Sequence, residues 1–175
     1  IGNTTPSAAI ACALMNASPE KIAGRGTGVD DDGLQRKISV IARALDVNKP
    51  NPKDGLDVLA KVGGFEIGGL AGVMIGAASK RVPVMVDGFI STAAALIAVT
   101  IAPQCKDYLI FAHRSKENGH ALMLEWLGVK PLLDLDLRLG EGTGAALGMS
   151  LAESACKILA EMATFGEAGV SQIVE

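Results

Sequence analysis

The chain has 175 residues, of which 49% are hydrophobic and 20% are charged. This length and apolar content exclude a disordered chain and allow a core that needs no disulfide or metal. The net charge of −3 leaves no basic surplus for a nucleic-acid backbone or an anionic membrane surface. The 21 glycines and the 3% aromatic content predict an aliphatic core, closely approaching backbones and many tight turns.

The cysteines and the first residues indicate in which cellular compartment the protein is expected. Cys12, Cys105 and Cys156 are far apart, odd in number and without a CxxC pair. We therefore expect reduced, mostly buried thiols in a cytoplasmic protein. No basic segment precedes an apolar stretch, so we expect no signal peptide. Because the chain opens at Ile1 rather than at a methionine, we also expect that an N-terminal part is missing.

One uncharged stretch raises the question of a membrane span, since the mean hydropathy is +0.35. It covers residues 88–105 and contains two threonines, a serine, a glutamine and a proline. A spanning helix needs about 20 mainly apolar residues. We interpret this stretch as a buried helix and expect no membrane partner.

The first half of the chain shows helical patterns separated by glycine and proline. Thr5 and Pro6 supply a cap and a first-turn proline for the first helix. Alternating glycines within 24–28 then interrupt the pattern. The expected helices cover 8–15, 34–45, 54–62 and 66–80. The last of them is rich in glycine and alanine and can pack unusually close to another element.

The second half alternates strand-like and helix-like segments. The expected strands cover 82–86, 108–112 and 132–135, and the helices after them cover 91–101, 116–127 and 150–162. This order predicts parallel strands joined by crossovers, and hence an α/β fold. We expect a three-layer α/β/α arrangement with a parallel, Rossmann-like sheet and glycine-rich loops at the strand ends. One domain over 1–165 and a tail over 166–175 complete the prediction.

The loop after the third expected strand is the most informative segment. It reads Gly140-Glu141-Gly142-Thr143-Gly144. Glycines leave the backbone bare, so a flat ligand can approach Glu141 closely, and a partly desolvated glutamate can accept a proton near neutral pH. The alternative is that Glu141 only stabilises the dipole of the last helix. The glycine spacing fits neither a P-loop nor a dinucleotide fingerprint.

Polar residues also follow the other two expected strands, and ligands bind at the carboxyl ends of parallel strands. Asp87 can hold ribose hydroxyls or cap the next helix. Ser115 can bind a phosphate or act as a plain helix cap. His113 could act as an acid or base. We expect no metal site, because no cysteine or carboxylate lies at ligand spacing from a histidine.

Several segments in this order resemble one family, the nicotinate-nucleotide–dimethylbenzimidazole phosphoribosyltransferases of cobamide synthesis. They are Gly2-Asn3-Thr4-Thr5-Pro6, Gly24-Arg25-Gly26-Thr27-Gly28, the run 51–64, the run 83–91 with Asp87-Gly88-Phe89, His113-Arg114-Ser115, and the run 137–146 around Glu141. Each segment alone is modest. Together they cover essentially the whole chain and are highly specific.

The resemblance implies an activity and a set of site residues. Such enzymes move phosphoribose from nicotinate mononucleotide to 5,6-dimethylbenzimidazole, giving α-ribazole phosphate and nicotinate, without a cofactor. Glu141 matches the family's general base. The residues expected to bind substrate are Asn3, Thr4, Gly26, Lys37, Asp87, Gly88, Ser115, Leu139, Gly140, Gly142 and Gly144. Asn3, Thr4, Gly26, Asp87, Gly88 and Ser115 would serve ribose and phosphate, and Lys37 matches an active-site lysine.

The chain departs from the family in length, because members are about twice as long and only the C-terminal half is matched. A family glutamate just before Gly2 and much of the benzimidazole pocket lie outside it. We therefore keep as alternatives an inactive fragment and a noncatalytic nucleotide-binding or sensing module. A structural domain without a ligand is a third reading, and it predicts that Asp87, Ser115 and Glu141 do not cluster. The family is dimeric, so we expect a homodimer.

Overall fold

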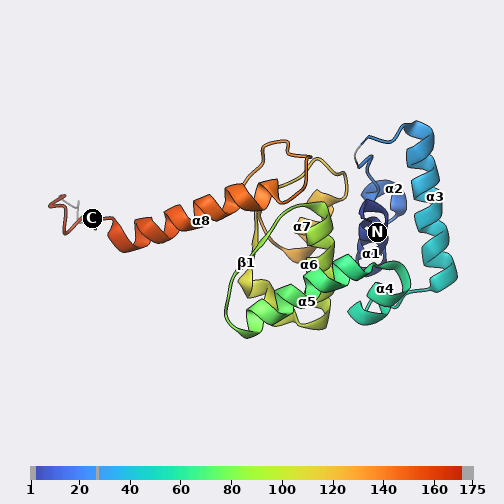
Figure 1. Ribbon diagram of the computed structural model, residues 1–175, viewed down its shortest axis with the longest axis horizontal. Coiled ribbons are helices and arrows are strands. Elements are labelled where there is room, and N and C mark those ends of the chain that lie inside the picture. The colour runs from blue at the N-terminus through green and yellow to red at the C-terminus, as the bar shows by residue number, and fades with distance from the viewer. Residues whose placement is uncertain (1–2, 27, 171–175) are drawn as a thin grey trace, which may run out of the picture.

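The structure is a computed structural model that describes residues 3–26 and 28–170 (Figure 1). The helices are α1 (Thr4–Met15), α2 (Pro19–Ile22), α3 (Asp31–Asn48), α4 (Gly55–Val62), α5 (Phe65–Ser79), α6 (Phe89–Ile101), the 3-10 helix η1 (Pro103–Tyr108), α7 (His120–Leu127) and α8 (Thr143–Glu161). The strands are β1 (Val84–Val86) and β2 (Leu109–Phe111). Gly2, Thr27 and the part of the predicted tail over 171–175 lie outside the described residues.

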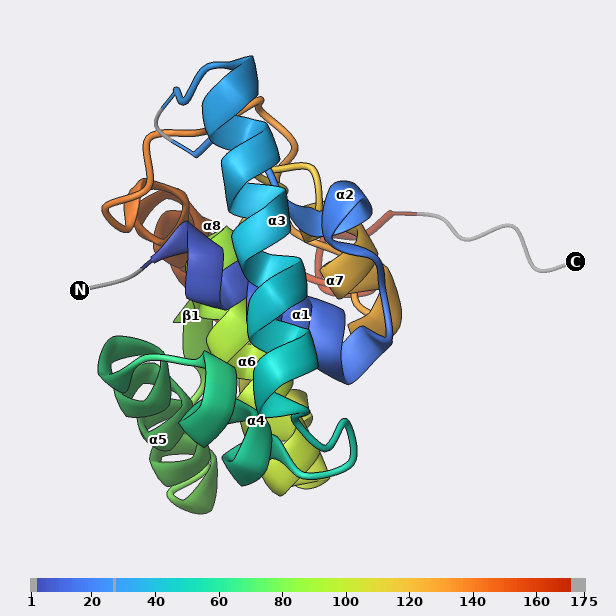
Figure 2. The ribbon, with the colours of Figure 1, turned by 90° about the vertical axis from the view of Figure 1, so that its right-hand side faces the viewer.

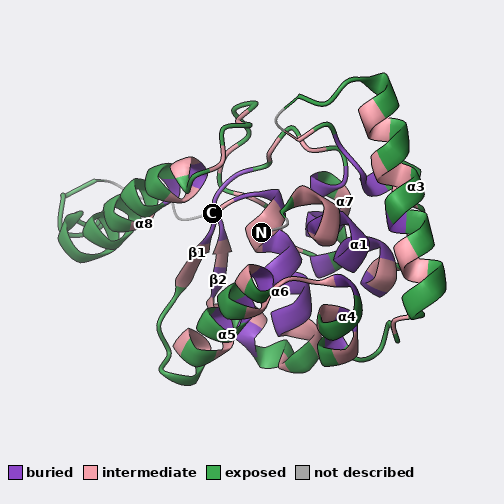
Figure 3. Cartoon of the chain, turned by 45° about the vertical axis from the view of Figure 1, so that its right-hand side comes forward, coloured by how far each residue is buried: buried purple, intermediate pink, exposed green. Residues whose placement is uncertain are grey.

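Helix α6 forms the centre of the core. Its residues from Thr92 to Ala98 are all buried, and the small side chains of Ala93, Ala94 and Ala95 let neighbouring helices approach. Helices α1, α4, α5 and α7 contact it, as the buried centre of Figure 3 shows. The interpretation of 88–105 as a buried helix is thus confirmed for α6, whereas Pro103 and Gln104 are exposed at the start of η1. Within the described residues, no helix is both long and apolar enough to cross a membrane.

The strands form a parallel sheet, which confirms the α/β class. Val84 pairs with Leu109, Met85 with Ile110 and Val86 with Phe111. Helix α6 connects the two strands, and helices α5, α6 and α8 contact β1. Both strands therefore end on the same edge of the sheet, where Asp87 and His113 follow them.

The third expected strand, 132–135, lies beside β2 but does not form a regular strand. Leu132 and Leu133 donate backbone hydrogen bonds to the strand-end carbonyls of Phe111 and Ala112 over 2.9 and 3.0 Å. A single parallel bridge joins His113 and Leu133. The backbone turns away at Asp136, whose φ of 57° is not compatible with an extended strand.

Several helices begin at other residues than predicted. The helix expected to begin at 116 begins at His120, because 116–119 form a turn region. The helix expected over 150–162 already begins at Thr143. The helix expected over 34–45 extends from Asp31 to Asn48, since the side chain of Asp30 accepts the Gly33 N–H and caps it.

Helices α3 and α8 lie on the outside of the molecule. Helix α3 packs across α1 (Figure 2), with only Ile41 fully buried. Helix α8 projects away from the body for most of its length (Figure 1). Its exposed apolar residues, and those that follow it, are Leu147, Met149, Leu151, Ile158, Leu159, Met162 and Phe165.

Two of the three cysteines are buried, as expected, and the third is exposed. All three thiols are free, and Cys12 and Cys105 are buried, whereas Cys156 is exposed on α8. Burial raises the pKa of Cys12 to about 12, and the nearby charge of Glu20 adds to that shift. The Cys12 thiol is therefore protonated and inert at neutral pH.

Candidate active site

A cavity of about 610 Å³ lies at the carboxyl ends of the strands. Nine predicted site residues line it: Asn3, Thr4, Gly26, Asp87, Gly88, Ser115, Leu139, Gly140 and Glu141. The other three predicted site residues, Lys37, Gly142 and Gly144, do not line it. The clustering of Asp87, Ser115 and Glu141 in one cavity contradicts the reading as a structural domain without a ligand.

Glu141 sits in a loop with an unusual backbone. Gly140, Glu141 and Gly142 have successive φ values of 77°, 57° and 77°, so all three are left-handed. Glycine adopts this conformation freely, whereas at Glu141 it costs about 1–2 kcal/mol. The Thr143 hydroxyl donates to the Gly140 carbonyl over 2.8 Å and closes the loop. The Glu141 side chain is exposed, so the expected desolvation would have to come from a bound ligand.

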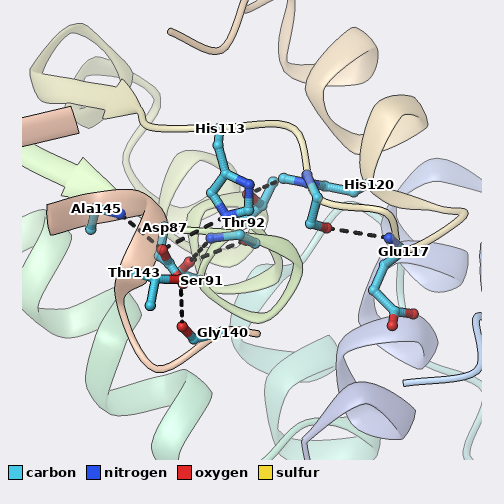
Figure 4. Close-up of polar contacts among 11 residues, drawn as sticks. Asp87, Ser91, Thr92, His113, Glu117, His120, Gly140, Thr143 and Ala145 are labelled. Carbon is cyan, nitrogen blue, oxygen red and sulfur yellow. Dashed lines mark hydrogen bonds and ion pairs between the residues drawn. The ribbon is translucent and has the colours of Figure 1, made fainter. Parts of the chain in front are cut away.

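Asp87 caps a helix that is distant in sequence (Figure 4). Its Oδ1 accepts the N–H of Ala145 over 2.9 Å. Ala145 is the third residue of α8, and its N–H is the one that an N-cap side chain normally accepts. The residue at the N-cap itself is Gly142, which has no side chain. Asp87 thus ties the end of β1 to the loop that carries Glu141, while it also lines the cavity.

His113 packs between the same two segments. Its Nε2 lies 3.7 Å from the Asp87 carboxylate, and the ring is 3% exposed. A Cβ at Gly144 would overlap His113 Cδ2 and lie 2.6 Å from Nε2, so only glycine fits there. His113 Nδ1 is buried without a hydrogen-bond partner among the described residues. His113 therefore fixes the distance between the end of β2 and the start of α8.

Ser115 is held by His120 rather than by a helix start. The Ser115 N–H donates to His120 Nδ1 over 2.9 Å. This amide is therefore not free to bind a phosphate, and only the Ser115 hydroxyl remains for a ligand. Since α7 begins five residues later, Ser115 is not its N-cap.

Lys37 supports the opposite wall of the cavity. Its Nζ donates to the Thr4 hydroxyl over 2.8 Å and to the Gly24 carbonyl over 2.9 Å. Burial lowers the pKa of Lys37, and the negative charge of Glu117 opposes that shift. Lys37 thereby holds α1 against the glycine segment that contains Gly26.

Some residues of the cavity wall were not predicted. Glu117 follows Ser115 in the same strand-end loop, so the strand-end rule could have found it. Leu70, Phe89 and Ile90 supply apolar surface on α5 and α6. No sequence motif points to Leu70, because its place depends on how α5 packs. In the described ranges, no group of three or more His, Cys, Asp or Glu residues is arranged to hold a metal ion.

This is an α/β protein with a cavity of mixed polar and apolar lining at the carboxyl ends of parallel strands, bordered by a glycine loop that carries a carboxylate. A family model described as "Phosphoribosyltransferase" matches residues 1–170. The chain is 65% identical over 175 residues to a nicotinate-nucleotide–dimethylbenzimidazole phosphoribosyltransferase of Roseiflexus sp. strain RS-1. It is 63% identical over 172 residues to the protein of the same name from Desulforudis audaxviator. The chain belongs to the nicotinate-nucleotide–dimethylbenzimidazole phosphoribosyltransferase family.

A solved structure supports the same assignment. The crystal structure of CobT from Thermus thermophilus matches with a TM-score of 0.92 and 49% sequence identity, over 99% of this chain and 51% of that one. The match to the Roseiflexus protein covers 100% of this chain and 50% of the relative, and the match to the Desulforudis protein covers 98% and 49%. The chain thus spans about half the length of the relatives that it matches.

Proposed function

We propose that the whole protein transfers 5-phosphoribose from nicotinate mononucleotide to 5,6-dimethylbenzimidazole. The products are α-ribazole 5′-phosphate and nicotinate, and the transfer is a step of cobalamin nucleotide-loop synthesis. The observation that carries the proposal is the shared cavity of Glu141, Asp87 and Ser115. Relatives that match the entire chain carry the name of this activity.

The reaction needs one base and good alignment. The bond between the anomeric carbon and the pyridinium nitrogen breaks, and its electron pair stays on nicotinate, which loses its ring charge. No acid is therefore needed for the leaving group. One benzimidazole nitrogen attacks the anomeric carbon from the opposite face, while the N–H proton at the other nitrogen passes to the Glu141 carboxylate. Attack from that face inverts the carbon and gives the α product.

The remaining walls of the cavity suit a phosphoribosyl group. Asn3, Thr4 and Ser115 offer amide and hydroxyl groups for a phosphate and ribose hydroxyls. Gly26 and Gly88 let the ligand approach the backbone. The Glu141 loop is shaped by Leu139, Gly140, Gly142 and Gly144. This loop aligns the reactants together with the contact between Lys37 and Thr4. Alignment of this kind supplies a large part of the rate enhancement in two-substrate transfers.

The proposal also covers the oligomeric state and the compartment of the protein. The proposed protein is a cytoplasmic homodimer without a cofactor, and residues 1–165 form its α/β nucleotide-binding unit, followed by a tail over 166–175. Free cysteines support the reducing compartment. The exposed apolar residues of α8, including Leu159 at 90% exposure, support contact with another polypeptide segment.

A substitution of Glu141 tests the activity in a protein of the relatives' full length. Glu141→Gln keeps the size and the loop but cannot accept the proton, so we expect kcat to fall at least about a hundredfold, within the range of general-base effects. Binding of nicotinate mononucleotide by calorimetry should change little. Glu125→Gln, at an exposed position of α7 outside the cavity, is the matched control.

Two outcomes would change the assignment. Normal turnover by Glu141→Gln would refute the role of the base. Binding of nicotinate mononucleotide without any product in the unsubstituted full-length protein would favour the noncatalytic binding module instead.

A further inference from the structure

A buried imidazole that does not line the cavity connects two of the loops that do. His120 is the first residue of α7 and is 0% exposed. Its ring lies edge-on to those of Phe89 and His113, with centroid distances of 6.5 and 6.3 Å. Phe89 follows the Asp87–Gly88 loop, and His113 lies two residues after the end of β2. His120 thus sits where the two strand-end loops meet (Figure 4).

Both ring nitrogens of His120 are used. Nδ1 accepts the Ser115 backbone N–H over 2.9 Å, so it carries no proton. Nε2 lies 2.9 Å from the Thr92 hydroxyl of α6. A neutral ring with a bare Nδ1 has its proton on Nε2, so Nε2 donates to Thr92. Burial, together with nearby His113 and Arg114, lowers the pKa of His120 to about 3. The ring is therefore neutral at neutral pH.

The direction of the Ser115 amide explains why an acceptor is needed. In this extended loop, the N–H groups of Arg114 and Lys116 donate to the carbonyls of Leu133 and Leu137 over 2.8 and 3.1 Å. Alternate amides of an extended backbone point to opposite sides, so the Ser115 N–H points inward, away from that neighbour. Buried amides without a partner are rare in folded proteins. His120 Nδ1 accepts the inward-pointing N–H of Ser115, so this amide has a hydrogen-bond partner.

We propose that His120 is a positioning residue for the phosphoribosyl site, whose Nδ1 holds the inward-pointing Ser115 amide and so fixes where the Ser115 hydroxyl enters the cavity. This inference rests on the proposed function. The imidazole does not line the cavity. It packs against the rings of Phe89 and His113 in the cavity wall, and its hydrogen bonds are to Ser115 and Thr92. Its loss therefore affects substrate binding more than the chemical step at Glu141.

The experiment separates the two hydrogen bonds of the ring in a protein of full length. His120→Asn places an amide oxygen near the position of Nδ1 and keeps an acceptor for Ser115. His120→Gln reaches the position of Nε2 and keeps only the contact with Thr92. His120→Leu removes both contacts at similar volume, and Thr92→Val removes the hydroxyl alone.

We expect His120→Leu and His120→Gln to raise the KM for nicotinate mononucleotide about tenfold or more, equivalent to ~1.4 kcal/mol. We expect kcat to stay within about threefold, since the base is untouched. His120→Asn and Thr92→Val should stay close to the unsubstituted protein. Hydrogen exchange of the Ser115 amide should follow the same order, slow in His120→Asn and Thr92→Val and fast in His120→Gln and His120→Leu.

Several results would overturn the inference. An unchanged KM in His120→Leu, beside normal turnover of the unsubstituted protein, would do so. Equal KM and equal Ser115 exchange in His120→Asn and His120→Gln would do so as well, and this comparison decides the question if His120→Leu does not fold. Absence of both turnover and nicotinate mononucleotide binding in the unsubstituted protein would instead overturn the proposed function.

Discussion

Gly144 lets the first turn of α8 lie directly on the imidazole of His113. A Cβ there would overlap Cδ2 and lie 2.6 Å from Nε2 of a ring that is buried and cannot move aside. We expect Gly144→Ala to lower the free energy of unfolding by about 1–3 kcal/mol, the usual cost of overpacking. Urea denaturation of this chain measures the effect.

A second glycine provides the control for Gly144→Ala. Gly69 lies in α5, and a Cβ there would meet nothing within 4 Å. Gly69→Ala should raise the free energy of unfolding by roughly 1 kcal/mol, since alanine favours the helix. If the two substitutions have the same effect, the contact between Gly144 and His113 does not limit packing.

His120 makes the stability of the fold depend on pH. Burial lowers its pKa in the folded chain to about 3, whereas the unfolded chain has the ordinary value of 6.5. Below pH 6.5 the unfolded chain therefore binds a proton that the folded chain does not, and stability falls as the pH falls toward 3. The titratable and charged groups that face the ring are His113 and Arg114.

Between pH 7.5 and 5.5 this single group should cost the fold roughly 1 kcal/mol. His120→Leu should lack that part of the pH dependence, because the variant has nothing to titrate at this position. Denaturation of both proteins at the two pH values gives the difference. Parallel loss of stability in both would show that His120 is protonated in the folded chain as readily as in the unfolded one.

At the level of single residues, sequence reasoning found most of the cavity wall but not the contacts behind it. Glycines and polar residues at strand ends predicted the places of Asp87, Ser115 and Glu141. The sequence left two alternatives open for Asp87, ribose binding and capping. The structure shows that it caps α8, 58 positions away, a contact that no local spacing predicts. The hydrogen bond from Ser115 to His120 was also missed, because it depends on the direction of one backbone amide.

Among the helices and strands, the cap supplied by Asp87 sets where α8 begins. The N-cap Gly142 has no side chain to accept an N–H, and Asp87 Oδ1 accepts that of Ala145 instead. Asp87→Ala should destabilise this chain by about 1 kcal/mol, the typical loss for an N-cap. Asp87→Asn keeps an acceptor oxygen and should lose less. Urea denaturation compares the two.

Hydrogen exchange locates the effect of the cap. The Ala145 amide should exchange faster in Asp87→Ala than in Asp87→Asn, and amides in the second half of α8 should not change. Equal exchange of Ala145 in the two variants would mean that Asp87 does not cap the helix. In the full-length protein, the loosened Glu141 loop should also lower kcat in Asp87→Ala.

The arrangement of helices and strands was predictable where periodic apolar residues decide it. The central helix and the two parallel strands follow from their apolar runs. The regular third strand expected over 132–135 was wrong, although leucine alternating with Asp134 and Asp136 is the pattern of a half-buried strand. These carboxylates pair with Arg114 and Lys116 over 2.6 and 3.3 Å, and the positive φ of Asp136 then ends the extended backbone. Of the α5 glycines expected to allow close packing, only Gly68 does so among the described residues, since a Cβ there would lie 3.1 Å from Leu59 Cδ2. A Cβ at position 69, 72 or 76 would meet nothing within 4 Å.

In the molecule as a whole, α8 is the element with the least internal support. It leaves the body of the fold (Figure 1). Apolar side chains along its length are exposed. The relatives are about twice as long as this chain. We infer that in the full-length protein these side chains are covered, and that the complete substrate site needs the same additional polypeptide.

Leu159 offers a test of this inference, because it is 90% exposed in this chain. In the chain alone, Leu159→Lys should change the free energy of unfolding by less than about 0.5 kcal/mol, as is usual for surface positions. In the full-length protein, the same substitution should cost about 2 kcal/mol or more, because it would place a charge in an apolar contact. Lys157→Ala, at a neighbouring exposed position paired only with Glu153, is the control for both proteins.

Turnover should also differ between the 175-residue chain and the full-length protein. We expect the 175-residue chain to give no α-ribazole phosphate from nicotinate mononucleotide and dimethylbenzimidazole, and the full-length protein to give it. Leu159→Lys should lower the turnover of the full-length protein if the covered face of α8 holds the Glu141 loop in place. Full activity of the isolated chain, or equal stability effects of Leu159→Lys in the two proteins, would show that α8 has no covering partner and that the cavity is complete without one.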